Sequence, residues 1–412
     1  MRLRIKDLAT KVGSGVTPKG GASVYQDNGI PLFRSQNVTN DGFLLDDIAY
    51  ISEEIHKSMI GTRLMPNDVL LNITGASIGR CYYLPKNFKE GNVNQHVCII
   101  RPKENVVIPA FLYYNLISAV GQQMIDVCQT GANREGLTKE DICNFEFDIP
   151  SLADQQRIVT YLDTKLSEID TQMSILTSKR DAYLRLKKSI INHAVTRGLN
   201  PNVKMKDSGI EWIGEVPEHW EVKRMKDIFF ERKELSLTGE EDLLSVSEFY
   251  GVARKKDKMN SDEEFESRAD SLVGYKICKA HDLVINIMLA WKTGLGISDN
   301  DGIVSPAYAV YEGRNIASHF YHYLLRSGMY VKEFKRHSKG IIDSRLRLYN
   351  DRFNNISAIY PPLPEQRAIA TYLDDKCAKI DIIVSNLDKQ ISRYADLKRS
   401  LIDEVITGKR AV

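Results

Sequence analysis

The chain lacks the features that mark several classes of protein. Its 412 residues include six cysteines with no CxxC pair, namely Cys81, Cys98, Cys128, Cys143, Cys278 and Cys377. Such spacing indicates neither a zinc site nor a disulfide framework, so we expect reduced thiols and no bound metal. No apolar run is long enough to span a membrane, and nothing after Met1 resembles a signal peptide. We therefore expect a cytoplasmic protein without a membrane partner.

Catalytic motifs are missing as well. The sequence has no GxxxxGK[ST] phosphate-binding loop and no HExxH zinc motif. Two short glycine pairs, at 13–15 and 294–296, lack the third glycine and the following helix of a cofactor-binding turn. The prolines at 361–362 lack the preceding Asp or Asn of an amino-methyltransferase motif. We expect no catalytic residues and no cofactor in this chain.

The net charge is only +2, so any basic surface must be local. The clearest cationic cluster is Arg254, Lys255, Lys256 and Lys258, and Lys339, Arg345 and Arg347 follow it in the same part of the chain. These side chains are candidates for contacts with DNA phosphates. A solvated surface loop is the alternative interpretation.

The chain contains an internal repeat. Residues 150–196 align with residues 361–407 without a gap, at a constant shift of 211, and 19 of the 47 pairs are identical. The identities include polar positions, such as Thr160, Asp163 and Lys165 with Thr371, Asp374 and Lys376. Two unrelated surface helices would not need the same polar residues twice.

Each copy carries an apolar residue at every seventh position, which is typical of a coiled coil. These residues, which we call the seam, are Leu162, Ile169, Leu176, Tyr183 and Ile190 in the first copy and Leu373, Ile380, Leu387, Tyr394 and Leu401 in the second. Two helices of roughly 42 residues would each extend about 60 Å. Antiparallel pairing of the copies is favoured, although the connection between them is long enough for a parallel pair.

The order along the chain is therefore block, helix, block, helix. We expect a first domain at 1–149, a helix at 150–197, a linker at 198–219, a second domain at 220–360 and a helix at 361–410. Short β-rich runs such as 69–74, 97–101, 283–287 and 307–311 dominate the blocks, with helices expected at 109–120 and 316–332. The predicted fold is α+β, with two mostly β domains, two long antiparallel coiled-coil helices and a pseudo-two-fold repeat.

Specific motifs surround both helices. They are PSLADQQR at 150–157, PPLPEQR at 361–367, YLD at 161–163 and 372–374, and DSGIEWIGEVPEHW at 207–220. With GVTP at 15–18, RSQN at 34–37 and GASIG at 75–79, the chain resembles the specificity subunit of type I restriction-modification systems over nearly its whole length. The second block departs from this pattern, because it has no GxTP and its RxxN strings stand just before the second helix.

The resemblance implies two target recognition domains, each reading one half of a split, asymmetric sequence in double-stranded DNA. It also implies that the helices bind two methyltransferase subunits, which carry S-adenosylmethionine, and that separate restriction subunits translocate and cut DNA. The specificity subunit itself would be non-catalytic. A coiled-coil adaptor with two protein-binding domains and no DNA readout remains the alternative.

Polar loops of the first block supply chemistry suited to base edges and phosphates. Their candidate DNA-binding residues are Ser14, Thr17, Lys19, Arg34, Gln36, Asn37, Thr74, Ser77, Arg80, Asn133 and Arg134. For each of them, a turn or a hydrogen bond within the domain is the competing role.

Overall fold

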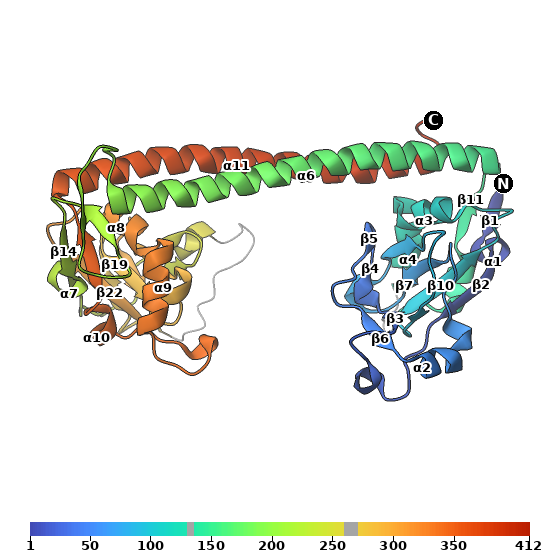
Figure 1. The fold of residues 1–412 in the computed structure, drawn as a ribbon, viewed down its shortest axis with the longest axis horizontal. Helices are drawn as coiled ribbons and strands as arrows, with labels where there is room; N and C mark the ends of the chain where they lie inside the picture. Colours follow the sequence, from blue (N-terminus) through green and yellow to red (C-terminus); the bar gives the residue numbers. More distant parts are fainter. Residues whose placement is uncertain (130–135, 259–270) are drawn as a thin grey trace. The chain divides into compact units, whose positions relative to one another are not determined.

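The computed structural model describes residues 1–129, 136–258 and 271–412. The chain forms two compact units, one of residues 1–176 and 389–412 and the other of residues 177–388. Each unit thus contains part of both long helices, α6 (Leu152–Arg197) and α11 (Leu363–Ile406) (Figure 1). These helices have 46 and 44 residues, slightly more than expected from the repeat.

The first unit is built on a four-stranded antiparallel sheet of order β2-β10-β7-β8 and a three-stranded sheet of order β6-β3-β9. Its strands are β1 (Arg2–Arg4), β2 (Ala9–Ser14), β3 (Ile30–Phe33), β4 (Val38–Thr39), β5 (Gly42–Phe43), β6 (Ala49–Ile51), β7 (Val69–Asn72), β8 (Cys81–Tyr83), β9 (Asn92–Val93), β10 (Val97–Pro102) and β11 (Glu146–Asp148). Its helices, besides α6 and α11, are α1 (Ile5–Leu8), α2 (Glu53–Ser58), α3 (Pro109–Ile117), α4 (Ala119–Gln129) and α5 (Lys139–Asn144).

The second unit repeats the four-stranded sheet, in the order β15-β22-β19-β20. Its strands are β12 (Met205–Asp207), β13 (Glu215–Pro217), β14 (Glu221–Arg224), β15 (Phe229–Glu231), β16 (Leu244–Ser247), β17 (Gly251–Arg254), β18 (Lys276–Cys278), β19 (Leu283–Asn286), β20 (Leu295–Ile297), β21 (Gly302–Val304), β22 (Tyr308–Gly313) and β23 (Ser357–Tyr360). Its short helices are α7 (Met225–Ile228), α8 (Ser318–Leu325), α9 (Gly328–His337) and α10 (Asn350–Phe353).

The strand predictions are confirmed, whereas the two helix predictions in the blocks need correction. Each expected helix is two helices, because the chain breaks at Ser118 and at residues 326–327. The Ser118 hydroxyl accepts a hydrogen bond from the Gly121 amide at 3.3 Å, so this residue starts the next helix instead of continuing the previous one. Residues 198–219, expected as a linker, contain the β12-β13 hairpin and contribute Ile213 and Val216 to the core of the second unit.

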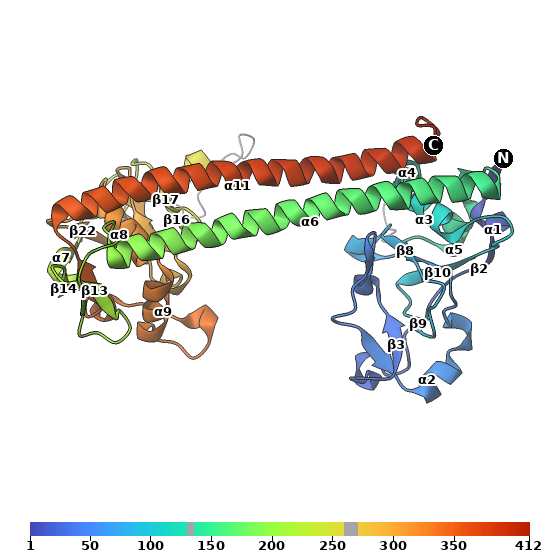
Figure 2. The ribbon, with the colours of Figure 1, turned by 45° about the horizontal axis from the view of Figure 1, so that its top comes forward.

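The long helices pair antiparallel, as expected. In the second unit Lys187 bonds Asp381 at 2.6 Å and Arg180 bonds Asp388 at 3.4 Å, so residue numbers fall along one helix as they rise along the other. In the first unit Leu162 and Ile169 pack in one cluster with Leu401. Figure 2 shows the helix pairing in a second view.

The seam residues predicted from the heptad pattern are all buried or half-buried. Six of them are buried, namely Leu162, Ile169, Leu373, Ile380, Leu387 and Leu401. The other four, Leu176, Tyr183, Ile190 and Tyr394, are half-buried. Apolar burial of this kind is the main stabilising contribution to a helix pair.

Candidate nucleic-acid interface

Three of the predicted loops in the first unit gather around the turn between β9 and β10. The loop that contains Gly15 approaches this turn so closely that a Cβ on Gly15 would lie 2.0 Å from the Val93 carbonyl oxygen. The Gly15 amide donates to the Val97 carbonyl at 3.0 Å, and the Val16 amide donates to the Val93 carbonyl at 3.2 Å. Glycine is therefore required at position 15 by close packing. Of the neighbouring candidates, Ser14 and Lys19 are exposed and Thr17 is half-buried.

The loop of residues 34–37 follows β3 and is held to the end of β7. The Asn72 side-chain amide donates to the Ser35 carbonyl at 2.7 Å. Asn37 is only 1% exposed, and its amide donates to the carbonyls of Leu44 and Asp47 at 2.9 and 3.1 Å. In this structure Asn37 shapes the loop, which is the competing role that the sequence allowed.

Arg34 and Gln36 share one carboxylate. The Arg34 guanidinium lies 3.2 Å from Asp47, and the Gln36 amide donates to the same carboxylate at 2.5 Å. Asp47 is exposed, with 80% of its side chain accessible. Only 22% of the Arg34 side chain is accessible, and its guanidinium also donates to the Asp47 backbone carbonyl at 2.6 Å, so Arg34 braces the loop in this structure.

The loop of residues 74–80 leaves β7 beside the same turn. The Thr74 hydroxyl lies 2.6 Å from Nδ1 of His96. Ser77 is half-buried in a short 3-10 helix (Gly75–Ser77), and Arg80 is exposed. The remaining candidates of this unit, Asn133 and Arg134, lie outside the described residues.

The turn itself was missed by the sequence prediction. Asn94, Gln95 and His96 connect two buried strands, and Gln95 is exposed. The signal was present in the sequence, as a polar tripeptide between Val93 and the apolar run that begins at Val97. Amide and imidazole groups at such a point can donate to and accept from base edges.

In the second unit, the cationic cluster is partly neutralised. Asp242 lies 3.3 Å from the Arg254 guanidinium and 2.7 Å from the Lys256 ammonium. The hydrogen bond from Lys256 lowers the pKa of the Asp242 carboxyl. Lys255 is half-buried in the short helix Lys255–Lys258, and the side chain of Lys258 lies outside the described atoms. The cluster is therefore less cationic than its sequence suggests.

A second basic surface of this unit surrounds Trp291, which the sequence prediction also missed. The indole lies on the loop that follows β19, and the ammonium groups of Lys292 and Lys335 are each 4.9 Å from its ring centroid. β19 occupies the place of β7 in the sheet order, so this loop corresponds to residues 74–80 of the first unit. The similar strings DVLLNI at 68–73 and DLVINI at 282–287 already indicate this correspondence in the sequence, although Trp291 was not identified as a candidate.

The other predicted cations, Lys339, Arg345 and Arg347, lie on the loop between α9 and α10. The amides of Lys339 and Arg347 each donate to the other residue's carbonyl at 2.9 Å, which closes the loop at its base. Lys339 and Arg345 are exposed and Arg347 is half-buried. This loop ends where the Leu348 amide donates to the Ile287 carbonyl, as the Leu137 amide does to the Ile73 carbonyl in the first unit.

Repeated contacts join each recognition domain to the helices of its own unit. The Tyr114 hydroxyl donates to Asp163 at 2.5 Å, and at the matching place the Tyr323 hydroxyl donates to Asp374 at 2.7 Å. Burial and this hydrogen bond raise the pKa of both tyrosines, so they stay protonated. The repeated Asp at 163 and 374 thus has a positioning role.

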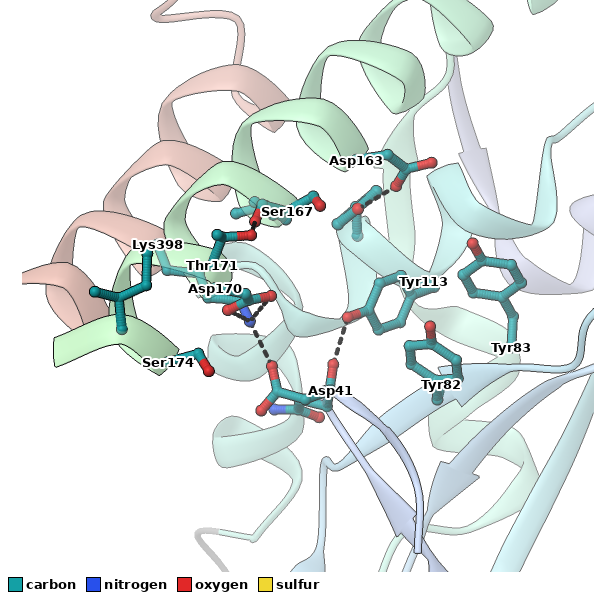
Figure 3. Close-up of a pocket in the computed structure, with 14 residues that line it drawn as sticks. Asp41, Tyr82, Tyr83, Tyr113, Asp163, Ser167, Asp170, Thr171, Ser174 and Lys398 are labelled. Carbon is teal, nitrogen blue, oxygen red and sulfur yellow. Dashed lines mark hydrogen bonds and ion pairs between the residues drawn. The ribbon is translucent and has the colours of Figure 1, made fainter. Parts of the chain in front are cut away.

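A contact specific to the first unit lies in the hollow of about 650 Å³ drawn in Figure 3. The Lys398 ammonium bonds Asp170 at 2.9 Å and Asp41, at the tip of the β4-β5 hairpin, at 2.6 Å. Burial lowers the pKa of Lys398, but the hydrogen bonds to Asp41 and Asp170 outweigh it and raise the pKa overall. Tyr113 reaches the same hairpin, since its hydroxyl donates to the Asn40 carbonyl at 2.5 Å.

Two further properties bear on function. Among the described residues, no group of three or more His, Cys, Asp or Glu side chains could hold a metal ion. None of the helices in the described ranges combines the length and the apolar character needed to cross a membrane.

Comparisons with known proteins identify the family. Residues 1–176 and 217–393 match the model of the type I restriction modification DNA specificity domain. The StySPI specificity subunit of Salmonella potsdam is 22% identical over 409 residues, which cover 96% of this chain and 86% of that protein. The MjaVIII specificity subunit of Methanocaldococcus jannaschii is 22% identical over 360 residues, covering 83% of this chain and 79% of the relative.

Solved structures show the same fold. A chain from a study of complex assembly and conformational transition of the type I R-M system has a TM-score of 0.71 at 14% identity, with 98% of this chain and 97% of that chain covered. The HsdS subunit of Thermoanaerobacter tengcongensis has a TM-score of 0.52 at 13% identity, with 100% and 97% covered. Because the family model matches both halves of the sequence, the chain belongs to the type I restriction-modification DNA specificity family.

Proposed function

We propose that this chain is the specificity subunit that reads a bipartite, asymmetric target in double-stranded DNA for a type I restriction-modification complex. The main support for this proposal is that the two units share a core sheet and its contacts with the long helices, while the loops around that sheet differ. The first unit presents amide, hydroxyl and imidazole groups around Gln95, and the second presents Trp291 among lysines. Because the two sheets match but their loops carry different side chains, the two units are suited to reading different half-sites.

The long helices are proposed to bind two methyltransferase subunits. Leu186 and Leu397 are related by the repeat, and each is 47% exposed. Neither belongs to the seam, so their identity is not explained by helix pairing. Because the two positions are related by the repeat, a partner that contacts one of these leucines would find the same side chain on the other copy. In this proposal those partners carry S-adenosylmethionine, restriction subunits supply translocation and cleavage, and this chain is non-catalytic.

Selection from a random duplex pool tests the proposal. The purified chain would be incubated with the pool, with and without its methyltransferase subunits, and the bound duplexes would be sequenced. We expect a motif of two short, unlike half-sites separated by an unread spacer. Recovery of one contiguous site, or of no motif from the complete complex, would contradict the proposal. The second outcome would favour the adaptor alternative, which the comparisons do not support.

A further inference from the structure

The loop between α9 and α10 ends in an apolar tip. Ile341 is 101% exposed and Ile342 is 52% exposed. Leaving an isoleucine in water forgoes the favourable free energy of its burial. Single exposed apolar residues are common on protein surfaces, so exposure alone does not indicate a function.

Several contacts brace this loop. Besides the pair of backbone hydrogen bonds between Lys339 and Arg347, the Arg345 amide donates to the Ile342 carbonyl at 2.8 Å. The Lys335 ammonium lies 2.9 Å from Asp343, which ties the tip to α9. Position 340 admits only glycine, since its φ is +153° and a Cβ there would lie 2.6 Å from the Arg345 carbonyl oxygen. Ile341 thus lies in a loop that is closed by backbone hydrogen bonds and tied to α9 by an ion pair.

Cations surround the apolar tip. Residues 335–347 contain five Lys or Arg residues and a single acidic one, Asp343. Lys339 and Arg345 are exposed on either side of the two isoleucines. In Figure 1 this orange loop follows α9 and projects from its unit. Proteins that bend DNA combine cations on the phosphates with an apolar side chain inserted between base pairs.

We propose that Ile341 is an apolar wedge that enters the base stack of the target when Lys339, Arg345 and Arg347 contact the backbone beside it. The inference rests on the proposed function and deepens it, because it assigns the second recognition domain a way to read the deformability of a base step. Sequences whose step unstacks at low cost would be preferred without a hydrogen bond to a base.

The chain offers a matched control. Leu237 is 87% exposed on a loop of the same unit, but its neighbours Glu240 and Glu241 are acidic. A Leu237→Ala variant removes a comparable exposed apolar group from a place that repels phosphates. Both substitutions are at exposed sites, so we expect the thermal midpoints of Ile341→Ala and Leu237→Ala to equal that of the wild type.

The test uses the full chain assembled with its methyltransferase subunits. Duplexes carrying the selected motif would contain 2-aminopurine at one purine at a time, since its fluorescence rises when a base unstacks. Methyltransferases that act on a base in a duplex flip that base out of the stack, so we expect a signal at the methylated positions. We expect one additional signal at another step, which Ile341→Ala abolishes, Ile341→Met retains and Leu237→Ala leaves unchanged.

Affinity gives a second readout. Ile341→Ala should weaken binding to the selected duplex about tenfold and change binding to an unrelated duplex less than about twofold. An unchanged fluorescence pattern and affinity for Ile341→Ala would overturn the wedge. So would a loss of assembly with the methyltransferase subunits, because the tip would then be a protein contact. Failure of the wild-type complex to select any split motif would instead refute the proposed function.

Discussion

The two recognition domains differ in their loops far more than in the way they contact the helices. In both, a glutamine near the start of the long helix accepts a hydrogen bond from a backbone amide of the domain at 2.8 Å, Gln155 from Ile108 and Gln366 from Ala317. In both, a tyrosine donates to the repeated aspartate. The comparison shows that the contacts with the helices repeat while the candidate reading surfaces do not.

Two lysines on the long helices, at equivalent positions of the repeat, also differ in their contacts. Lys187 and Lys398 are related by the repeat, and each bonds the aspartate on the opposite helix. Lys398 bonds Asp41 of the recognition domain as well, whereas Lys187 has only Asp381 among the described ion pairs. The first recognition domain therefore has an electrostatic connection to the helix pair that has no described counterpart in the second.

The largest effect is expected from a charge in the seam. Leu387 is 4% exposed, while Leu176, its equivalent in the first copy, is half-buried. Leu387→Asp should lower the free energy of unfolding by about 3 kcal/mol or more, because its carboxylate cannot reach water. Leu176→Asp should cost about half as much. Chemical denaturation of both variants measures the difference, and equal losses would show that the copies are equally packed.

The next largest loss of stability is expected from removal of the tyrosine hydroxyls. Tyr114→Phe should cost about 2 kcal/mol, because the hydrogen bond to the Asp163 carboxylate is lost. Tyr323→Phe should cost about 1 kcal/mol, since Tyr323 is more exposed and water can replace it at Asp374. Thermal unfolding of each variant provides the measurement. A larger loss of stability for Tyr323→Phe than for Tyr114→Phe would contradict this prediction.

A smaller difference in stability is expected between substitutions of the two equivalent lysines on the long helices. Lys398→Met leaves two carboxylates without their cation and should cost about 1 kcal/mol, whereas Lys187→Met should cost less than about 0.5 kcal/mol. The folded pKa of Lys398 is raised, so its contribution is present below the unfolded pKa of about 10.4 and is lost as the pH rises through the folded pKa. The stability difference between wild type and Lys398→Met should therefore be constant from about pH 7 to 10 and shrink above that range.

The smallest effects concern salt dependence. Neutralising Lys339, which is exposed beside the proposed wedge, should reduce the slope of log affinity against log salt by about one. Lys256→Ala should reduce it by less than one, because Lys256 already bonds Asp242. Binding titrations at several salt concentrations measure the slope for each variant. The cationic cluster at 254–258 would be the better phosphate contact if Lys256→Ala had the greater effect.

The sequence predicted the helical frame in detail and the reading surface only in part. A heptad repeat constrains every seventh residue of a long helix, so the seam could be placed residue by residue. Loops follow no such period, and their surface depends on which distant segments meet. Nothing local shows that Asn37 is buried or that Asp242 neutralises Arg254 and Lys256.

Exchange of the second recognition block tests the central claim most directly. Residues 220–360 would be replaced by the matching block of a relative with a different target, with both long helices retained, and the complex would select from a random duplex pool. We predict that one half-site changes and the other half-site is recovered unaltered. A change in both half-sites, or in neither, would contradict the claim that each domain reads its own half of the target.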